Sequence, residues 1–131
     1  MRLTSHRLVL AGLAIVGLAA TLACGSSYSA PMGPPPPAAD VTITILGMNG
    51  ALSFTPDPGV VPVGKTVAWR NADTGAYGGG TTHHISADNG SFTTGDLAPG
   101  AVSAPIMMAT AGAVPYHCTI HPTMVGTLNV Q

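Results

Sequence analysis

From residue 41 onward, apolar and polar positions alternate along the chain with the period of β-strands. The segment VTITILG (41–47) alternates as a half-buried strand does. Proline and glycine interrupt the β-branched stretch GVVPVGKTVAWRN (59–71), which therefore predicts two strands with a turn between them. Four more strand candidates follow, at 81–87, 101–109, 113–118 and 126–131. Turn-forming clusters separate the candidates: TPDPG, NADTGAYGGG, ADNG and LAPG.

The density of short strands and turns defines the expected fold. We expect an all-β domain over residues 41–131: a Greek-key antiparallel β-sandwich of about seven or eight strands. The composition agrees, because 17 glycines and 12 prolines favour turns over long helices. Only 7% of the residues are charged, and no basic run is present to hold a nucleic-acid backbone. We therefore do not expect the protein to bind nucleic acid.

The first 40 residues have the pattern of an exported protein. Arg2 and Arg7 precede an apolar run over residues 8–23, which is shorter than the roughly 20 residues needed to span a bilayer. Cys24 follows directly and resembles the lipid-attachment position of bacterial lipoproteins. We therefore expect an export signal of lipoprotein type over 1–24 and a Pro/Gly/Ser-rich linker over 25–40. An ordinary secretory signal and an uncleaved anchor are the alternatives.

Removal of that signal changes the charge and the cysteine content. Lys65 and Arg70 remain against five aspartates, so the net charge becomes 2 − 5 = −3. With Cys24 lipidated or removed, Cys118 is the one free thiol, and it has no partner for an intramolecular disulfide. Metal binding is one purpose for such a thiol. The expected location is the periplasm or the outer face of a bacterial membrane.

Metal-binding side chains gather in the stretch YHCTIHPTM (116–124). Strand alternation over 113–118 places Cys118 on the inner face with Val114 and Tyr116, and turns His117 outward. His121 and Met124 follow in a loop that can curl around one centre. The stretch therefore offers a thiolate, an imidazole and a thioether to the same ion.

The fourth ligand is expected from the segment TTHHISA (81–87). Alternation groups His83 with the apolar Ile85 and Ala87, so His83 is favoured as the ligand and His84 is the alternative. The predicted set is His83, Cys118, His121 and Met124. Two histidines, one cysteine and a weak methionine form the ligand set of electron-transfer copper sites, whereas structural zinc sites usually recruit more cysteines or histidines.

With these motifs, the chain resembles the cupredoxins, the small blue copper proteins. The loop CTIHPTM is closest in spacing to amicyanin within the plastocyanin-like group, and the resemblance extends over residues 41–131. It implies one type 1 copper per chain, with His83 and His121 as imidazole ligands, Cys118 as thiolate and Met124 as axial thioether. His84 stands where plastocyanins often have an asparagine that ties the ligand-bearing segments together.

The resemblance also implies a function. It indicates a one-electron carrier, not an enzyme, with His121 and Pro122 as the electron port and with transient redox proteins as partners of a monomer. The alternatives are a module for copper delivery, storage or resistance, and a structural sandwich with a vestigial or zinc site. Delivery proteins often offer several methionines, but Met107 and Met108 are expected to pack in the core.

Overall fold

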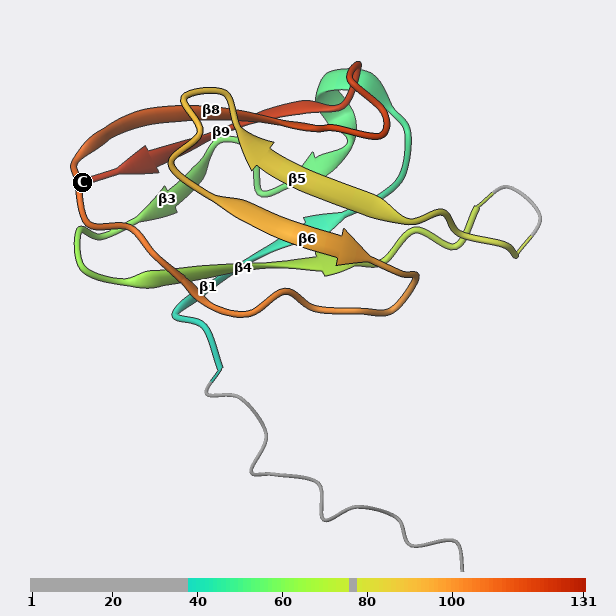
Figure 1. The fold of residues 1–131 in the computed structure, drawn as a ribbon, viewed down its shortest axis with the longest axis horizontal. Helices are drawn as coiled ribbons and strands as arrows, with labels where there is room; N and C mark the ends of the chain where they lie inside the picture. The colour runs from blue at the N-terminus through green and yellow to red at the C-terminus, as the bar shows by residue number, and fades with distance from the viewer. Residues whose placement is uncertain (1–37, 76–77) are drawn as a thin grey trace, which may run out of the picture. The chain divides into compact units, whose positions relative to one another are not determined.

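The computed structural model describes residues 38–75 and 78–131 (Figure 1). The strands are β1 (Val41–Ile45), β2 (Phe54–Thr55), β3 (Gly59–Val61), β4 (Thr66–Asn71), β5 (His83–Ala87), β6 (Thr93–Leu97), β7 (Ile106–Met107), β8 (Gly112–Cys118) and β9 (Val125–Val130), with one 3-10 helix, η1 (Gly50–Leu52). The expected export signal, Cys24 and most of the linker lie outside the described residues and stay predictions.

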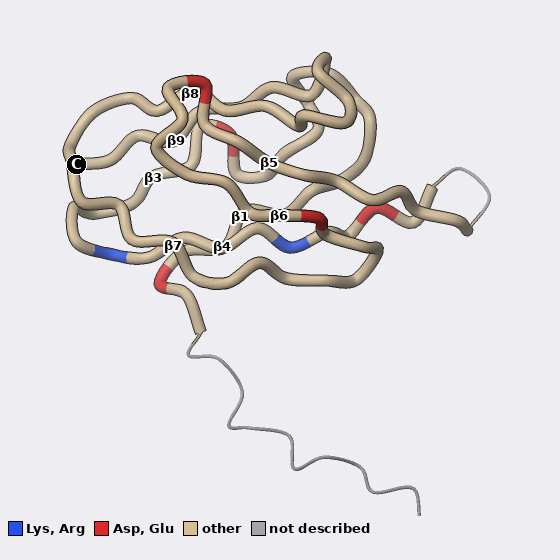
Figure 2. Tube along the Cα trace, viewed as in Figure 1, with Lys and Arg blue, Asp and Glu red and all other residues tan. Residues whose placement is uncertain are grey.

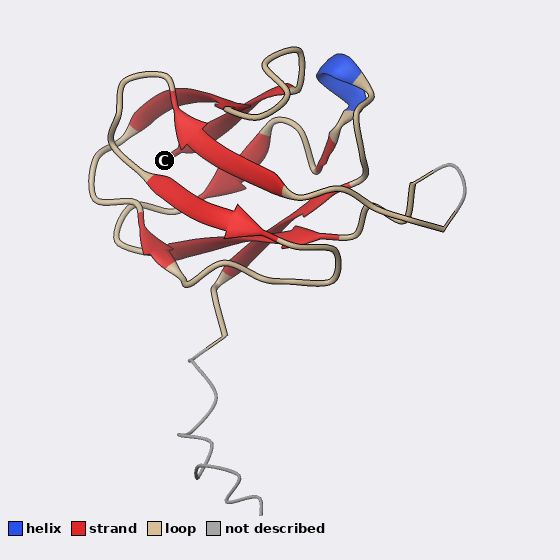
Figure 3. Ribbon diagram, turned by 45° about the vertical axis from the view of Figure 1, so that its right-hand side comes forward, coloured by secondary structure: helices blue, strands red, loops and turns tan. Residues whose placement is uncertain are grey.

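The strands form two layers that enclose one core, so the all-β sandwich is confirmed (Figures 1 and 3). A four-stranded sheet has the order β2-β1-β4-β7, and a five-stranded sheet has the order β3-β9-β8-β5-β6. Apolar side chains from both sheets fill the space between them: Ile43, Ile45, Val67, Trp69, Ile85, Tyr116 and Leu128. Strand alternation creates this core, since the inner positions of each strand are the apolar ones.

The sheets are mixed, which corrects the expectation of a purely antiparallel sandwich. β1 pairs with β4 in parallel, and β3 pairs with β9 in parallel. The reason is the path of the chain: β3 lies in the second sheet, so β4 re-enters the first sheet beside β1 without a hairpin between them. The hairpin-like pairs, β5 with β6 and β8 with β9, are antiparallel as expected.

β2 was not among the predicted strands, and β6 and β7 also differ from the prediction. β6 lies in a stretch for which no strand was predicted, and its Gly95 has a φ of 71°, a backbone conformation that departs from regular strand geometry and favours glycine. The strand expected over 101–109 shortens to β7, because Pro105 has no N–H to donate. Before β7, Ser103 binds β4 in place of regular strand pairing. Its N–H donates to the carbonyl of Trp69, and its hydroxyl accepts the N–H of Trp69.

The five-stranded sheet brings two predicted ligands together. β5 and β8 are neighbours, and their register places Ile85 opposite Cys118, so the start of β5 and the end of β8 meet at the same end of the sandwich. β8 and β9 pair up to His117 and Val125, and residues 119–124 form the loop that connects the two strands. η1 lies beside this end and contacts β9 (Figure 3).

The basic residues of the described chain lie outside the ligand-bearing sheet. Lys65 directly precedes β4, and Arg70 lies within β4 of the opposite sheet (Figure 2). None of the described segments forms a helix with the length and apolar character needed to cross a membrane.

Candidate metal centre

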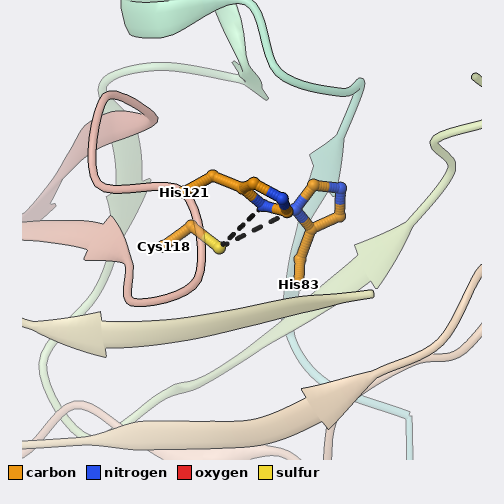
Figure 4. Close-up of side chains that lie close together, drawn as sticks. All are labelled: His83, Cys118 and His121. Carbon is orange, nitrogen blue, oxygen red and sulfur yellow. Dashed lines mark hydrogen bonds between the residues drawn. The ribbon is translucent and has the colours of Figure 1, made fainter. Parts of the chain in front are cut away.

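Three of the predicted ligands converge on one point (Figure 4). Cys118 Sγ lies 3.7 Å from Nδ1 of His83 and 3.7 Å from Nδ1 of His121. The two imidazole rings meet at an interplanar angle of 62° with their centroids 5.1 Å apart. The ligand atoms of the three residues all lie within 4.8 Å of one another.

This arrangement fits a metal ion of the soft or borderline class. Ligand bonds of about 2.0–2.3 Å to nitrogen and sulfur let atoms at this spacing share one ion. A thiolate with two neutral imidazoles is a donor set that suits copper, because copper accepts both soft sulfur and imidazole nitrogen. The geometry of the described residues is therefore compatible with the copper site expected from the sequence.

Burial differs between the three side chains. His83 and Cys118 have no exposed surface, whereas His121 is partly exposed. His83 is the first residue of β5, and Cys118 is the last residue of β8. Both occupy inward-facing positions of strands in which buried and less buried residues alternate. Among the described residues, the cluster is thus buried on the side of His83 and Cys118 and partly exposed on the side of His121.

Met124, the fourth predicted ligand, is fully buried in the same loop. Its backbone closes the loop: the Cys118 N–H donates to the carbonyl of Met124 at 3.0 Å, and the Met124 N–H donates to the carbonyl of His121 at 2.9 Å. These two bonds fix the curl that sequence spacing predicted. Coordination by the Met124 thioether stays a prediction.

The ring of His84 points away from the cluster, toward Asp96 and Thr93. Its Nδ1 lies 2.8 Å from Asp96 Oδ1, and its Nε2 lies 2.7 Å from Thr93 Oγ1. The backbone of His84 supplies the link between the ligand segments: its N–H donates to Cys118 Sγ at 3.5 Å, and its carbonyl accepts the Thr119 N–H at 2.8 Å. The main chain of His84 therefore ties the two ligand-bearing segments together.

His117 is partly exposed and lies outside the cluster, as alternation predicted. Its Nδ1 lies 2.6 Å from Asp88 Oδ1. His117 sits opposite Ser86 of β5, on the outer face of the sheet. It therefore takes no part in the convergence of His83 and Cys118.

Asp73 contacts a predicted ligand and was missed in the sequence. Its Oδ2 lies 3.1 Å from Nε2 of His83, on the ring edge opposite the nitrogen that faces Cys118. Asp73 is 7% exposed. Burial alone would raise the pKa of Asp73, but hydrogen bonds from Gly75, Thr81 and His83 hold that pKa at about 2, so the side chain is a carboxylate at neutral pH.

The sequence carried only a weak signal for Asp73. An aspartate two residues before a glycine favours a local Asx-turn, and the Gly75 N–H does donate to Asp73 Oδ1 at 2.7 Å. No local sequence pattern indicates that the other carboxylate oxygen, Oδ2, contacts His83. Asn71, also missed, stabilises the same region, because its side-chain amide donates to the carbonyls of Thr81 and Leu97.

Comparison with known proteins supports the fold and the metal. No protein-family profile and no curated protein sequence matches the chain. A purple cupredoxin from Nitrosopumilus maritimus is similar in structure, with a TM-score of 0.57 and 27% identity over 70% of this chain and 100% of that chain. A reduced Cu(I) form of an amicyanin variant gives a TM-score of 0.55 and 24% identity over 72% of this chain and 86% of that chain.

A larger copper protein also contains this fold. A Cu-containing nitrite reductase from Thermus scotoductus SA-01 has a TM-score of 0.55 and 24% identity, and the match covers 76% of this chain but 23% of the reductase chain. At this identity the likeness to the reductase and to amicyanin shows the fold alone. Together with the convergence of His83, Cys118 and His121, these likenesses identify the domain as cupredoxin-like, with a cluster that fits a type 1 copper site.

Proposed function

We propose that the protein is a type 1 copper protein that carries one electron at a time between exported or membrane-bound redox partners. The observation that supports this most is the convergence of two imidazole nitrogens on one buried thiol at the end of a β-sandwich. The proposed ligands are His83, Cys118 and His121, with Met124 as a weak axial thioether. Copper bound there would supply the one-electron couple between Cu(I) and Cu(II).

The surroundings of the cluster suit electron transfer because they resist rearrangement. His83 and Cys118 belong to paired strands, and the backbone of His84 hydrogen-bonds to both Cys118 and Thr119. The two backbone bonds of Met124 hold the loop that carries His121. Side chains fixed in this way move little when the charge at the centre changes, which keeps the barrier to electron transfer low.

His121 and Pro122 form the proposed electron port. His121 is the partly exposed member of the cluster, and Pro122 beside it is exposed. Ile120 in the same loop is 48% exposed, and Leu52 of η1, at the same end, is 77% exposed. A small apolar surface of this kind suits brief contacts with a redox protein. We propose transient redox partners and a monomeric carrier.

Electron transfer without bond chemistry is the proposed activity, so the protein is not proposed to be an enzyme. The match to the nitrite reductase spans 23% of that chain, which is one part of a larger protein. Export and attachment through a lipid on Cys24 are proposed from the sequence pattern of residues 1–24.

Copper delivery is the alternative function, and the positions of Met107 and Met108 do not favour it. Met108 is buried as expected, whereas Met107 is exposed, which corrects the expectation that both pack in the core. Both line a pocket with Gly112 and Ala113, at the end of β8 opposite Cys118. Transfer of copper to a competing chelator within minutes would favour delivery, whereas retention with fast electron exchange would favour the carrier.

The first test is spectroscopic. We expect the full chain, expressed with its export segment and loaded with Cu(II), to show an intense visible band from thiolate-to-copper charge transfer and a narrow copper hyperfine splitting. Cys118→Ser should abolish the band and keep the far-ultraviolet circular dichroism of the sandwich. A pale wild-type protein, or a Cys118→Ser variant that keeps the band, would refute the proposed centre.

A further inference from the structure

We propose that Asp73 is a positioning residue of the metal centre, which fixes the ring of His83 from behind and places a negative charge next to this ligand. The inference rests on the proposed copper site. Asp73 lies in the turn between β4 and β5 and reaches His83 across ten residues of sequence. Its effect is exerted through His83, since the carboxylate faces Nε2 and the thiol of Cys118 faces Nδ1.

The carboxylate is held by several donors at once. Oδ1 accepts the Gly75 N–H at 2.7 Å. Oδ2 accepts the Thr81 N–H at 3.2 Å and the Thr81 hydroxyl at 3.0 Å, and it lies 3.1 Å from His83 Nε2. A buried group with this many fixed donors has one orientation, so it can impose an orientation on the ring that it contacts.

The backbone around Asp73 is fixed as well. The Asp73 N–H donates to Asn71 Oδ1 at 3.0 Å. Gly80 passes so close to the Asp73 carbonyl that a Cβ at position 80 would lie 1.8 Å from that oxygen. The segment before β5 therefore packs directly on Asp73, and only glycine fits at this crossing.

The hydrogen bond selects one tautomer of His83. A carboxylate without a proton can only accept, so Nε2 of His83 must carry the hydrogen and donate it to Asp73. Nδ1 is then left with its lone pair, and this nitrogen is the one 3.7 Å from Cys118 Sγ. The ring thus faces the metal position with the correct nitrogen before any metal arrives.

The two histidines of the cluster are consequently unequal. His83 is fully buried with a carboxylate behind it, whereas Nε2 of His121 has no hydrogen-bond partner within residues 38–75 and 78–131. The charge of Asp73 stabilises the more positive ion, so it favours Cu(II) over Cu(I) and lowers the reduction potential.

The test compares Asp73→Asn with two matched variants, each made in the full chain. Asn is nearly isosteric but neutral, and we expect about a 10–100-fold loss of Cu(II) affinity, a smaller loss of Cu(I) affinity and a higher reduction potential. Asp96→Asn removes the carboxylate beside His84 and should leave both affinities unchanged. Thr81→Val removes a hydroxyl that donates to Asp73 and lies 3.3 Å from His83 Nε2, but it keeps the charge of Asp73, so it should lower the apo-protein's melting temperature and keep the Cu(II)/Cu(I) affinity ratio.

Nitrogen NMR of the metal-free wild type tests the same inference without a variant. At mildly alkaline pH we expect His83 to carry its hydrogen on Nε2; a hydrogen on Nδ1 overturns the proposal, whether or not Asp73→Asn folds. An Asp73→Asn protein with the wild-type Cu(II)/Cu(I) ratio also overturns it and leaves the copper centre intact. A wild type without a charge-transfer band defeats the copper function instead, and with it the effect of Asp73 on potential.

Discussion

At the residue scale, Gly126 of β9 shows how closely the two neighbouring strands pack behind the metal centre. A Cβ at this position would lie 2.6 Å from Cζ and from the hydroxyl oxygen of Tyr116. The ring of Tyr116 cannot retreat, because it packs edge-on against Phe54 at 5.0 Å and against Trp69 at 5.6 Å between centroids. Glycine is therefore required here for lack of space.

We expect Gly126→Ala to destabilise the fold by about 1–3 kcal/mol, the usual cost of an overpacked core. Gly59→Ala is the matched control, since its Cβ would lie 2.6 Å from Cδ1 of Ile43, the movable end of a flexible side chain. Its cost should be smaller. Urea unfolding of both variants measures the difference, and equal costs would contradict the view that the Tyr116 ring is held in place.

At the element scale, Asp40 joins the beginnings of β1 and β4. Its Oδ2 accepts the Thr66 N–H at 2.9 Å and the Thr66 hydroxyl at 2.8 Å, while its own N–H donates to Thr66 Oγ1 at 3.1 Å. The Lys65 ammonium lies 3.2 Å from the other carboxylate oxygen. Because β1 and β4 are parallel and have no hairpin between them, this contact helps to set their register.

The contact predicts a dependence of stability on pH. Hydrogen bonds from the backbone and the hydroxyl of Thr66, with help from Lys65, lower the pKa of Asp40 from 3.8 to about 2. Since the folded pKa lies below the unfolded one, the stabilisation is complete above about pH 4 and is lost as the pH falls toward 2. The melting temperature of Asp40→Asn should lie below that of the wild type at pH 6, and the gap should narrow in acid.

Lys65→Gln separates the two causes, since it removes the ion pair and keeps the bonds to Thr66. Exposed ion pairs contribute little, so this variant should melt close to the wild type at every pH. A gap between Asp40→Asn and the wild type that stays constant from pH 6 to pH 2 would show that the carboxylate charge is not involved.

The elements also show what could be predicted from the sequence. β1, β5, β8 and β9 follow from alternation, because their inner positions are apolar, whereas β4 follows from the β-branched stretch after Gly64. β6 could not be found in this way, since Gly95 and Asp96 lie within it and the strand depends on its pairing with β5. Parallel pairing was missed because it depends on how the chain crosses between sheets, which no local pattern records.

The residues of the metal cluster also divide into those that local sequence patterns predict and those that they do not. Cys118 and His121 are close in sequence, and His83 lies on a strand whose inner face is apolar, so spacing and alternation suffice for them. Asp73 is different, because its contact with His83 spans a turn whose course depends on the approach of Gly80. Long-range contacts made by turn residues are the part of the site that the sequence does not reveal.

At the scale of the whole molecule, the centre joins parts of the sandwich that are distant in the chain. His83 comes from β5, Cys118 from β8 and His121 from the loop before β9. An ion bound to all three binds only the folded chain and so shifts the unfolding equilibrium. The metal should therefore stabilise the whole domain as well as provide its redox chemistry.

We expect Cu(II) to raise the melting temperature, by the equivalent of about 2.7 kcal/mol when free copper exceeds the dissociation constant 100-fold. The gain should shrink in Cys118→Ser, which lacks the thiolate. Calorimetric scans with and without the metal provide the measurement. Identical melting of the two wild-type forms would favour a structural domain with a vestigial site.

The complete burial of Cys118 has a consequence for the reactivity of the metal-free protein. A thiol with no exposed surface cannot meet a water-soluble alkylating reagent until the strands around it separate. Its rate of modification therefore reports how often this end of the sandwich opens. In an oxidising compartment, burial also protects the thiol from oxidation of the sulfur and from mixed disulfides. The metal-free protein therefore keeps Cys118 in the reduced form that can bind a metal.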